Sequence, residues 1–228
     1  MKNVSVIIPY KPDNGHRDIV FKWIKCFYKK SMPEVELCIG DCKSELFNRS
    51  QAINTAAQKA TKDVFVIADG DVMYNPDVLV KAIRLLNKHA WIIPYSKCLD
   101  LSRSSTEKLL SSIPEWPLSI KGEYKERYKN KSFNPVGGLV VVTRKTFYAV
   151  GGFDERFIGW GGEDDAFAYA VNTLCGHFQR LDEKNYHLWH AVYRLVNCRK
   201  YQVSQFPRFL GNSGPPKLMK FGMKLSKK

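Results

Sequence analysis

The stretch "VFVIADGDVMYNPD", residues 64–77, decides the prediction of the fold. It opens with five apolar residues, a run short enough for a strand that is buried on both faces, as strands of parallel sheets are. Two carboxylates separated by a glycine, Asp69 and Asp71, follow the run directly. Asn75-Pro76-Asp77 then predicts the start of a helix, with proline in or near its first turn. The stretch therefore indicates a buried strand, a polar turn and a helix.

Strand and helix patterns alternate on both sides of this stretch. The alternation predicts an α/β protein with a mostly parallel central sheet flanked by helices. Ligands of such sheets lie beyond the carboxyl ends of the strands. The further strands are predicted at 4–8, 35–39, 91–94 and 138–142, and the further helices at 16–28, 47–60, 145–150 and 164–174.

Residues 97–135 interrupt the alternation. The segment is polar, rich in serine and charge, and contains Pro114 and Pro117. We interpret it as a long excursion over the active face, helical only around residues 104–111, and long loops of this kind are often lids. The predicted organisation is a catalytic domain over residues 1–194 and a basic tail over residues 195–228.

The composition limits the classes of protein to which the chain can belong. The chain has 228 residues and is 44% apolar, which is enough for one sizeable core. No apolar stretch approaches the roughly 20 residues that span a bilayer, and no secretion leader is visible. The six cysteines are scattered without a paired CxxC set, which indicates neither a zinc site nor a disulfide framework. We therefore expect a cytoplasmic protein.

The positive charge gathers at the C-terminal end. Ten of the fourteen net charges lie in residues 184–228, which contain no acid. A basic tail on a nearly neutral body suggests an anionic partner: nucleic acid, an acidic glycan or a membrane surface, with peripheral membrane contact as one form. The alternative is a disordered tail that only adds solubility.

The acids after residue 68 suit a metal. An Asp-x-Asp at a strand end can hold Mn²⁺ or Mg²⁺ against a diphosphate, because hard cations prefer oxygen ligands. The alternative is an ordinary turn, since Asp and Gly are common in turns. Pro9-Tyr10-Lys11 and Gly40-Asp41 also follow predicted strands, so we expect all three segments at one edge of the sheet.

A second acidic segment is "FIGWGGEDDAF", residues 157–167. Its acids complement the positive end of a helix dipole, which explains one acid better than three adjacent ones. A carboxylate beside a sugar hydroxyl can serve as a general base, and Trp160 offers a flat apolar face for a sugar ring. Further on, His187 and His190 lie three residues apart; packing is the alternative to metal binding by one of them.

Three segments in order resemble the catalytic domains of the GT-A nucleotide-sugar glycosyltransferases. The similarity is to β-1,4-galactosyltransferases, polypeptide N-acetylgalactosaminyltransferases and chondroitin polymerases, over roughly residues 3–194. The segments are "FNRSQAINTAAQKATKD" (47–63), "ADGD" (68–71) and "GGFDERFIGWGGEDDAF" (151–167). The last block is the longest and the most specific.

The resemblance implies roles for individual residues. Asp164 becomes the catalytic base, with Glu163 beside it at the sugar and acceptor. Asp71 becomes a metal ligand together with His190, with His187 as its rival. Lys11 stands where the family usually has Arg, and a lysine ammonium cannot make the bidentate contact of a guanidinium. The residues assigned to the donor are Pro9, Tyr10, Lys11, Asp41, Phe47, Arg49, Asp69, Gly138 and Trp160.

The predicted function follows from these roles. We expect a metal-dependent transferase that moves a sugar from a UDP-linked nucleotide donor to a hydroxyl. We expect inversion, because the retaining relatives carry Asn at the position of Asp164. The acceptor is an anionic or membrane-associated glycan, or a hydroxylated base in DNA. The alternative is a nucleic-acid-binding module with a vestigial sugar site. We further expect a stand-alone bacterial or phage-encoded enzyme in the cytoplasm, peripheral at the membrane.

Overall fold

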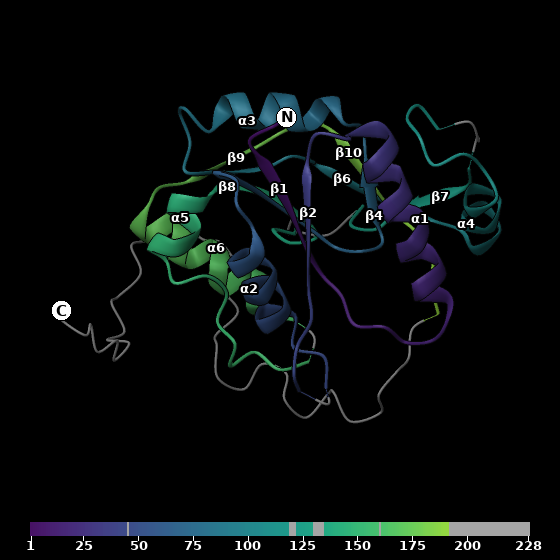
Figure 1. Ribbon diagram of the computed structural model, residues 1–228. Coiled ribbons are helices and arrows are strands. Elements are labelled where there is room, and N and C mark those ends of the chain that lie inside the picture. The colour runs from purple at the N-terminus through teal and green to yellow at the C-terminus, as the bar shows by residue number, and fades with distance from the viewer. Residues whose placement is uncertain (45, 119–121, 130–134, 160, 192–228) are drawn as a thin grey trace.

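The central sheet runs through the middle of the protein (Figure 1). The computed structural model describes residues 1–44, 46–118, 122–129, 135–159 and 161–191. The strand order is β2-β1-β3-β8-β5-β9. The strands are β1 (Val4–Pro9), β2 (Glu36–Gly40), β3 (Val64–Ala68), β5 (Trp91–Ile93), β8 (Leu139–Thr143) and β9 (Phe178–Arg180).

The directions of the strands confirm a mostly parallel α/β sheet. The pairs β1–β2, β1–β3 and β5–β9 are parallel, whereas β8 is antiparallel to both β3 and β5. Its sequence, LVVVT, is buried at four of five positions. A strand buried on both faces is apolar throughout whichever way it runs, so the sequence predicts β8 but not its direction.

The helices cover the two faces of this sheet. The chain crosses from β1 outward to β2 and back over β1 to β3, and right-handed crossovers in opposite directions place α1 and α2 on opposite faces. In Figure 1, α5 and α6 lie together on one side of the molecule, with α4 on the other. The helices are α1 (His16–Ser31), α2 (Arg49–Lys59), α3 (Asp77–Leu85), α4 (Arg103–Leu110), α5 (Arg144–Ala149) and α6 (Glu163–Leu174).

A second, smaller sheet has the order β4-β10-β6-β7 and was not predicted. Its strands are short and several are polar, so neither an apolar run nor a clean alternation marks them. The described part of the 97–135 excursion contains β6, α4 and β7, with the helix close to its expected position. The strands are β4 (Val72–Tyr74), β6 (Lys97–Leu101), β7 (Tyr124–Glu126) and β10 (Lys184–His187).

Within the described ranges, no helix has the length and apolar character needed to cross a membrane. The basic tail, residues 195–228, lies outside the part of the chain that the structure describes. Its separation from the catalytic domain stays a prediction.

Candidate active site

The two aspartates of the turn after β3 are held by different parts of the fold. The N–H of Asp69 donates to the carbonyl of Gly138 at 3.0 Å, and the N–H of Val72 donates to the carbonyl of Asp69 at 3.2 Å. The carbonyl of Asp71 accepts from the N–H of Leu188 at 2.9 Å. Asp69 is therefore tied to the start of β8, and Asp71 is tied to the end of β10.

Arg49 joins Asp69 to the acids of α6. Its Nε and Nη2 donate to Oδ1 of Asp69 at 2.9 and 2.8 Å, and its Nη1 donates to Oδ1 of Asp164 at 2.8 Å. Nη1 also lies 3.5 Å from Oε1 of Glu163. Three predicted site residues from distant parts of the sequence therefore meet around one guanidinium, with Glu163 buried and Asp69 and Asp164 about one-third exposed.

Local structure explains how the starts of α2 and α6 come together at Arg49. Asn48 caps α2 by accepting the N–H of Gln51 at 2.9 Å, and its side-chain amide donates to the carbonyl of Glu155 at 2.7 Å. The backbone of Asn48 also bridges to Gly159. Gly162, at φ 92°, adopts a left-handed conformation that glycine tolerates and turns the chain directly into α6. The chain ahead of α6 is thus anchored to the start of α2 through Glu155 and Gly159.

Negative charge is in excess around Arg49. Burial raises the pKa of Glu163 to about 7, with the charge of Asp164 adding to the effect and Arg49 opposing it. Burial also raises the pKa of Asp69, helped by the charges of Asp71 and Asp164, even though Arg49 lowers it. One guanidinium does not offset the desolvation of Glu163 and Asp69, so the site favours a further cation or a proton.

Asp71, His187 and His190 form the metal-type cluster of the site. Nε2 of His190 lies 3.0 Å from Oδ2 of Asp71, and Nε2 of His187 lies 3.7 Å from Oδ1. One ligand atom from each residue falls within 4.8 Å of the others. Ligands held at about 2.1 Å from one ion are separated by about 3–4 Å, so the three residues fit a single divalent cation.

The charges of this cluster agree with that fit. Burial alone would raise the pKa of Asp71, but His187 and His190 lower it well below its ordinary value. Burial lowers the pKa of His190, and Asp71 more than reverses this, so the net shift is upward. We expected one histidine to face inward; both approach Asp71, because the end of β10 lies beside it.

The remaining predicted donor residues lie at the same edge or beside it. Tyr10 stacks on Phe21 with ring centroids 3.7 Å apart and hydrogen-bonds to Asp18. Nζ of Lys11 donates to the carbonyl of Ser44 at 2.8 Å. Pro9 pairs with the last residue of β2, Asp41 is exposed and accepts the N–H of Cys42, and Phe47 is half-buried. Trp160 lies outside the described residues.

Gly137 and Gly138 complete the site, and only Gly138 was predicted. A Cβ on Gly137 would lie 1.8 Å from Oδ2 of Asp164, so its backbone passes directly against that carboxylate. Gly138 has a φ of 80°, in the left-handed region, and a Cβ there would lie 3.8 Å from Oδ2 of Asp69. The glycine pair before a strand was the available signal for Gly137, because backbone that must approach a side chain closely favours glycine.

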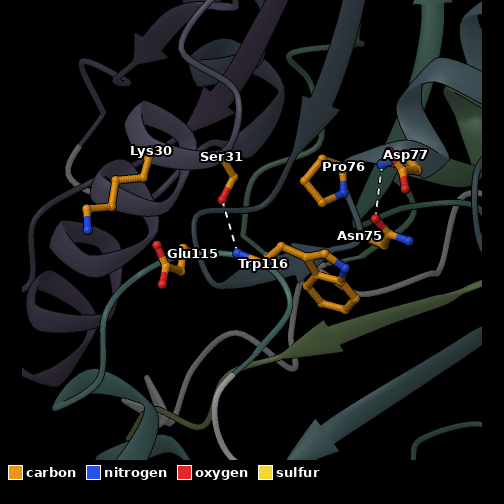
Figure 2. Close-up of a pocket in the computed structure, with 7 residues that line it drawn as sticks. All are labelled: Lys30, Ser31, Asn75, Pro76, Asp77, Glu115 and Trp116. Carbon is orange, nitrogen blue, oxygen red and sulfur yellow. Dashed lines mark hydrogen bonds between the residues drawn. The ribbon is translucent and has the colours of Figure 1, made fainter.

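A separate pocket of about 360 Å³ lies away from these residues (Figure 2). In it, the backbone N–H of Trp116 donates to Oγ of Ser31 at 3.3 Å. It contains none of the predicted site residues and no clustered catalytic groups, so we place the chemistry at the Arg49 and Asp71 sites. The pocket is lined by Lys30, Ser31, Asn75, Pro76, Asp77, Glu115 and Trp116.

Comparisons with known proteins point the same way. A family model described as the N-terminal domain of galactosyltransferase matches residues 119–191. The chain is 26% identical over 170 residues to β-1,4-galactosyltransferase 4 of Cricetulus griseus, covering 72% of this chain and 41% of that protein. It is 27% identical over 163 residues to β-1,4-galactosyltransferase 6 of Homo sapiens, covering 71% and 36%. The chain thus spans about two-fifths of these relatives.

A solved structure supports the fold. The structure of GalNAc-T7 with UDP, GalNAc and Mn²⁺ matches with a TM-score of 0.50 and 13% identity, over 82% of this chain and 44% of that one. At this identity the match speaks for the fold alone. The predicted resemblance is confirmed: the family model and the curated relatives are those of galactosyltransferases, and the solved structure supports the predicted GT-A fold.

Proposed function

We propose that this domain is a divalent-metal-dependent, inverting glycosyltransferase that moves a sugar from a UDP donor to an acceptor hydroxyl. The observation that carries the proposal is the meeting of two groups at the ends of β3 and β10. One is the cation-type cluster of Asp71, His187 and His190, and the other is the acid pair Glu163 and Asp164 held by Arg49. A structural domain has no evident use for so many carboxylates at one edge.

A metal ion held by Asp71, His187 and His190 would stabilise the leaving group. An ion bound there would neutralise the charge that develops on the departing diphosphate. The structure of GalNAc-T7, which shares the fold, contains UDP and Mn²⁺. Two imidazoles beside one carboxylate suit a first-row transition ion better than Mg²⁺, which prefers oxygen ligands. We therefore propose Mn²⁺ as the ion that this site prefers.

Asp164 is the proposed base. Its Oδ1 is held by Arg49, while Oδ2 faces the backbone of Gly137, so the carboxylate is fixed in place before any substrate arrives. In a single displacement it would take the proton of the acceptor hydroxyl as that oxygen attacks the anomeric carbon. Glu163 is buried next to it in the sequence, and burial raises its pKa to about 7, which suits a hydrogen-bond donor to a sugar hydroxyl better than a second base.

Turnover of a panel of UDP-sugars with Mn²⁺ tests this proposal, with product stereochemistry determined by NMR. The Asp164→Asn variant should lose about 10²–10⁴-fold in kcat, the usual contribution of a general base. Asp165→Asn is the matched control, since Asp165 is the neighbouring acid of the same helix turn and is exposed to solvent. Wild-type turnover by the Asp164 variant would exclude it as the base, and a retained anomeric configuration would exclude inversion.

The acceptor proposal rests on charge. The ten cations of residues 184–228 suit an anionic or membrane-associated glycan, or DNA that carries a hydroxylated base. We propose a cytoplasmic enzyme that acts on such an acceptor. Removing the chain after Gly214 should lower transfer to the acceptor and leave hydrolysis of the donor unchanged. Equal transfer by the shortened and full chains would exclude a role of residues 215–228 in acceptor binding.

A further inference from the structure

His187 lies between two carboxylates because β10 lies between β4 and β6. The strand register pairs His187 with Val72 on one side, directly after Asp71, and with Asp100 on the other. Nε2 of the imidazole is 3.7 Å from Oδ1 of Asp71, whereas Nδ1 is 3.2 Å from Oδ1 of Asp100. The two ring nitrogens therefore face different acids.

Asp100 is itself held in place. Nε of Arg127 donates to Oδ2 of Asp100 at 2.9 Å, and Nη2 of Arg127 contacts Oδ1. The backbone N–H of Arg127 donates to the carbonyl of Cys98, which fixes the base of the arginine beside β6. Oδ1 of Asp100 is fully buried, and the groups that approach it are Nη2 of Arg127 and Nδ1 of His187. A buried acceptor in this state favours a proton on Nδ1 of His187.

His190 has the same arrangement with a different acceptor. Its Nε2 faces Asp71 at 3.0 Å, and its Nδ1 lies 3.1 Å from the carbonyl oxygen of Ala191. Both histidines thus turn Nε2 toward Asp71 and Nδ1 toward an oxygen acceptor. Since metal-binding histidines usually donate their other N–H to a carboxylate or a carbonyl, this pattern is typical of a prepared metal site.

We propose that Asp100 and Arg127 are positioning residues for the metal site, a role that rests on the proposed function. Asp100 accepts the Nδ1–H of His187 and so keeps the lone pair of Nε2 directed at the site, and Arg127 fixes Asp100. Asp100 is not a further ligand, because it faces the opposite edge of the ring and lies outside the cluster whose ligand atoms are within 4.8 Å among the described residues.

Binding of Mn²⁺ alone to the full chain tests the proposal, followed by the loss of the electron paramagnetic resonance signal of free Mn²⁺. Asp100→Ala should raise the Kd for Mn²⁺ by about 10–100-fold, the usual effect of losing such a partner. Asp100→Asn retains an oxygen acceptor and should recover part of the loss. Glu183→Gln is the matched control, because its carboxylate is similarly exposed (30% against 33% for Asp100) and pairs with Lys81 outside the cluster.

A second readout separates orientation from mere stability. In the metal-free wild type, the ring ¹⁵N shifts of His187 should report a proton on Nδ1, and Asp100→Ala should shift the population toward Nε2–H. Arg127→Met provides a second variant in case Asp100→Ala fails to fold, and it should weaken Mn²⁺ binding in the same direction. Circular dichroism of each variant checks that the fold is retained.

The outcomes distinguish this inference from the function on which it rests. If the folded Asp100 and Arg127 variants bind Mn²⁺ within about twofold of the wild type while Asp71→Asn loses binding, the positioning role is wrong and the metal site stands. If Asp71→Asn binds Mn²⁺ as well as the wild type does, both the metal site and the positioning role fail.

Discussion

Replacing Arg49 with methionine removes the guanidinium that contacts Asp69, Glu163 and Asp164, while keeping an unbranched side chain of similar length. The side chain of Arg49 is only 12% exposed, so water does not readily replace its contacts. The variant therefore leaves three carboxylates close together with no compensating charge from this position. We expect the folded state to lose stability, and the loss to depend on pH.

The magnitude follows from the exposure of the partners. Breaking a buried ion pair by removing one partner usually costs about 3–5 kcal/mol, because the other charge stays buried. Asp69 and Asp164 are 34% and 28% exposed, so water screens part of the effect and we expect the lower end of that range. A loss of about 3 kcal/mol at pH 8 corresponds to a fall in Tm of about 6–12 °C for a chain of this size. Burial already raises the pKa values of Glu163 and Asp69, so at pH 5 these two carboxyls hold protons more readily, and the loss should shrink to about 1 kcal/mol.

Urea unfolding at pH 8 and pH 5, followed by circular dichroism, measures both quantities. The control is Arg156→Met, which removes an arginine that is 79% exposed and pairs with Asp154, and which should change stability by less than about 0.5 kcal/mol. A loss below about 1 kcal/mol for the Arg49 variant at pH 8, or a loss of equal size at both pH values, would refute the reasoning.

Three further predictions concern the site. Gly137→Ala should displace Asp164, because the new Cβ would lie 1.8 Å from Oδ2 of Asp164. We expect kcat to fall by about 10²-fold while the protein stays folded. Steady-state kinetics measure the fall in kcat, and circular dichroism checks the fold. The pKa of Glu163 is about 7 in the folded state and about 4.3 when unfolded, so only the folded state holds the proton between these values, and stability should fall as pH rises through this window. Glu163→Gln should flatten that part of the curve in unfolding experiments. Turnover should be higher with Mn²⁺ than with Mg²⁺ at equal concentration if the proposed ligands His187 and His190 offer nitrogen to the ion, and equal turnover would contradict that ligand set.

The sequence predicted the parts of the fold that carry a strong local signal. β3 spans the predicted residues 64–68, and α6 starts one residue before its predicted position at the acidic block. The second sheet was missed because its strands are only three to five residues long and join segments such as 72–74 and 184–187 that are distant in sequence. Pairing between such segments is a tertiary effect that no local pattern encodes.

The site was predicted unevenly for the same reason. Acids at strand ends and at a helix start are visible in the sequence as short motifs. The carboxyl ends of parallel strands lie at one edge of the sheet, so these acids were expected to lie together. The bridging of three acids by Arg49 depends on how α2, β3 and α6 pack, and the resemblance indicated only that it touches the nucleotide. Asp100 was missed because its partner across the strands, His187, is far away in sequence and belongs to an unpredicted sheet.

The separation between Arg49 and its partners also bears on how the protein folds. The bond from Arg49 to Asp164 joins positions 115 residues apart, across every element from β3 to α5. Contacts at such separations require the closure of long loops, so they are slow to form and come late in folding. In a nascent chain that has not yet docked α6, the guanidinium of Arg49 would have Asp69 as its partner but would lack Glu163 and Asp164. We therefore expect amide exchange protection at the α6 start to appear in the same kinetic step as the ability to bind donor.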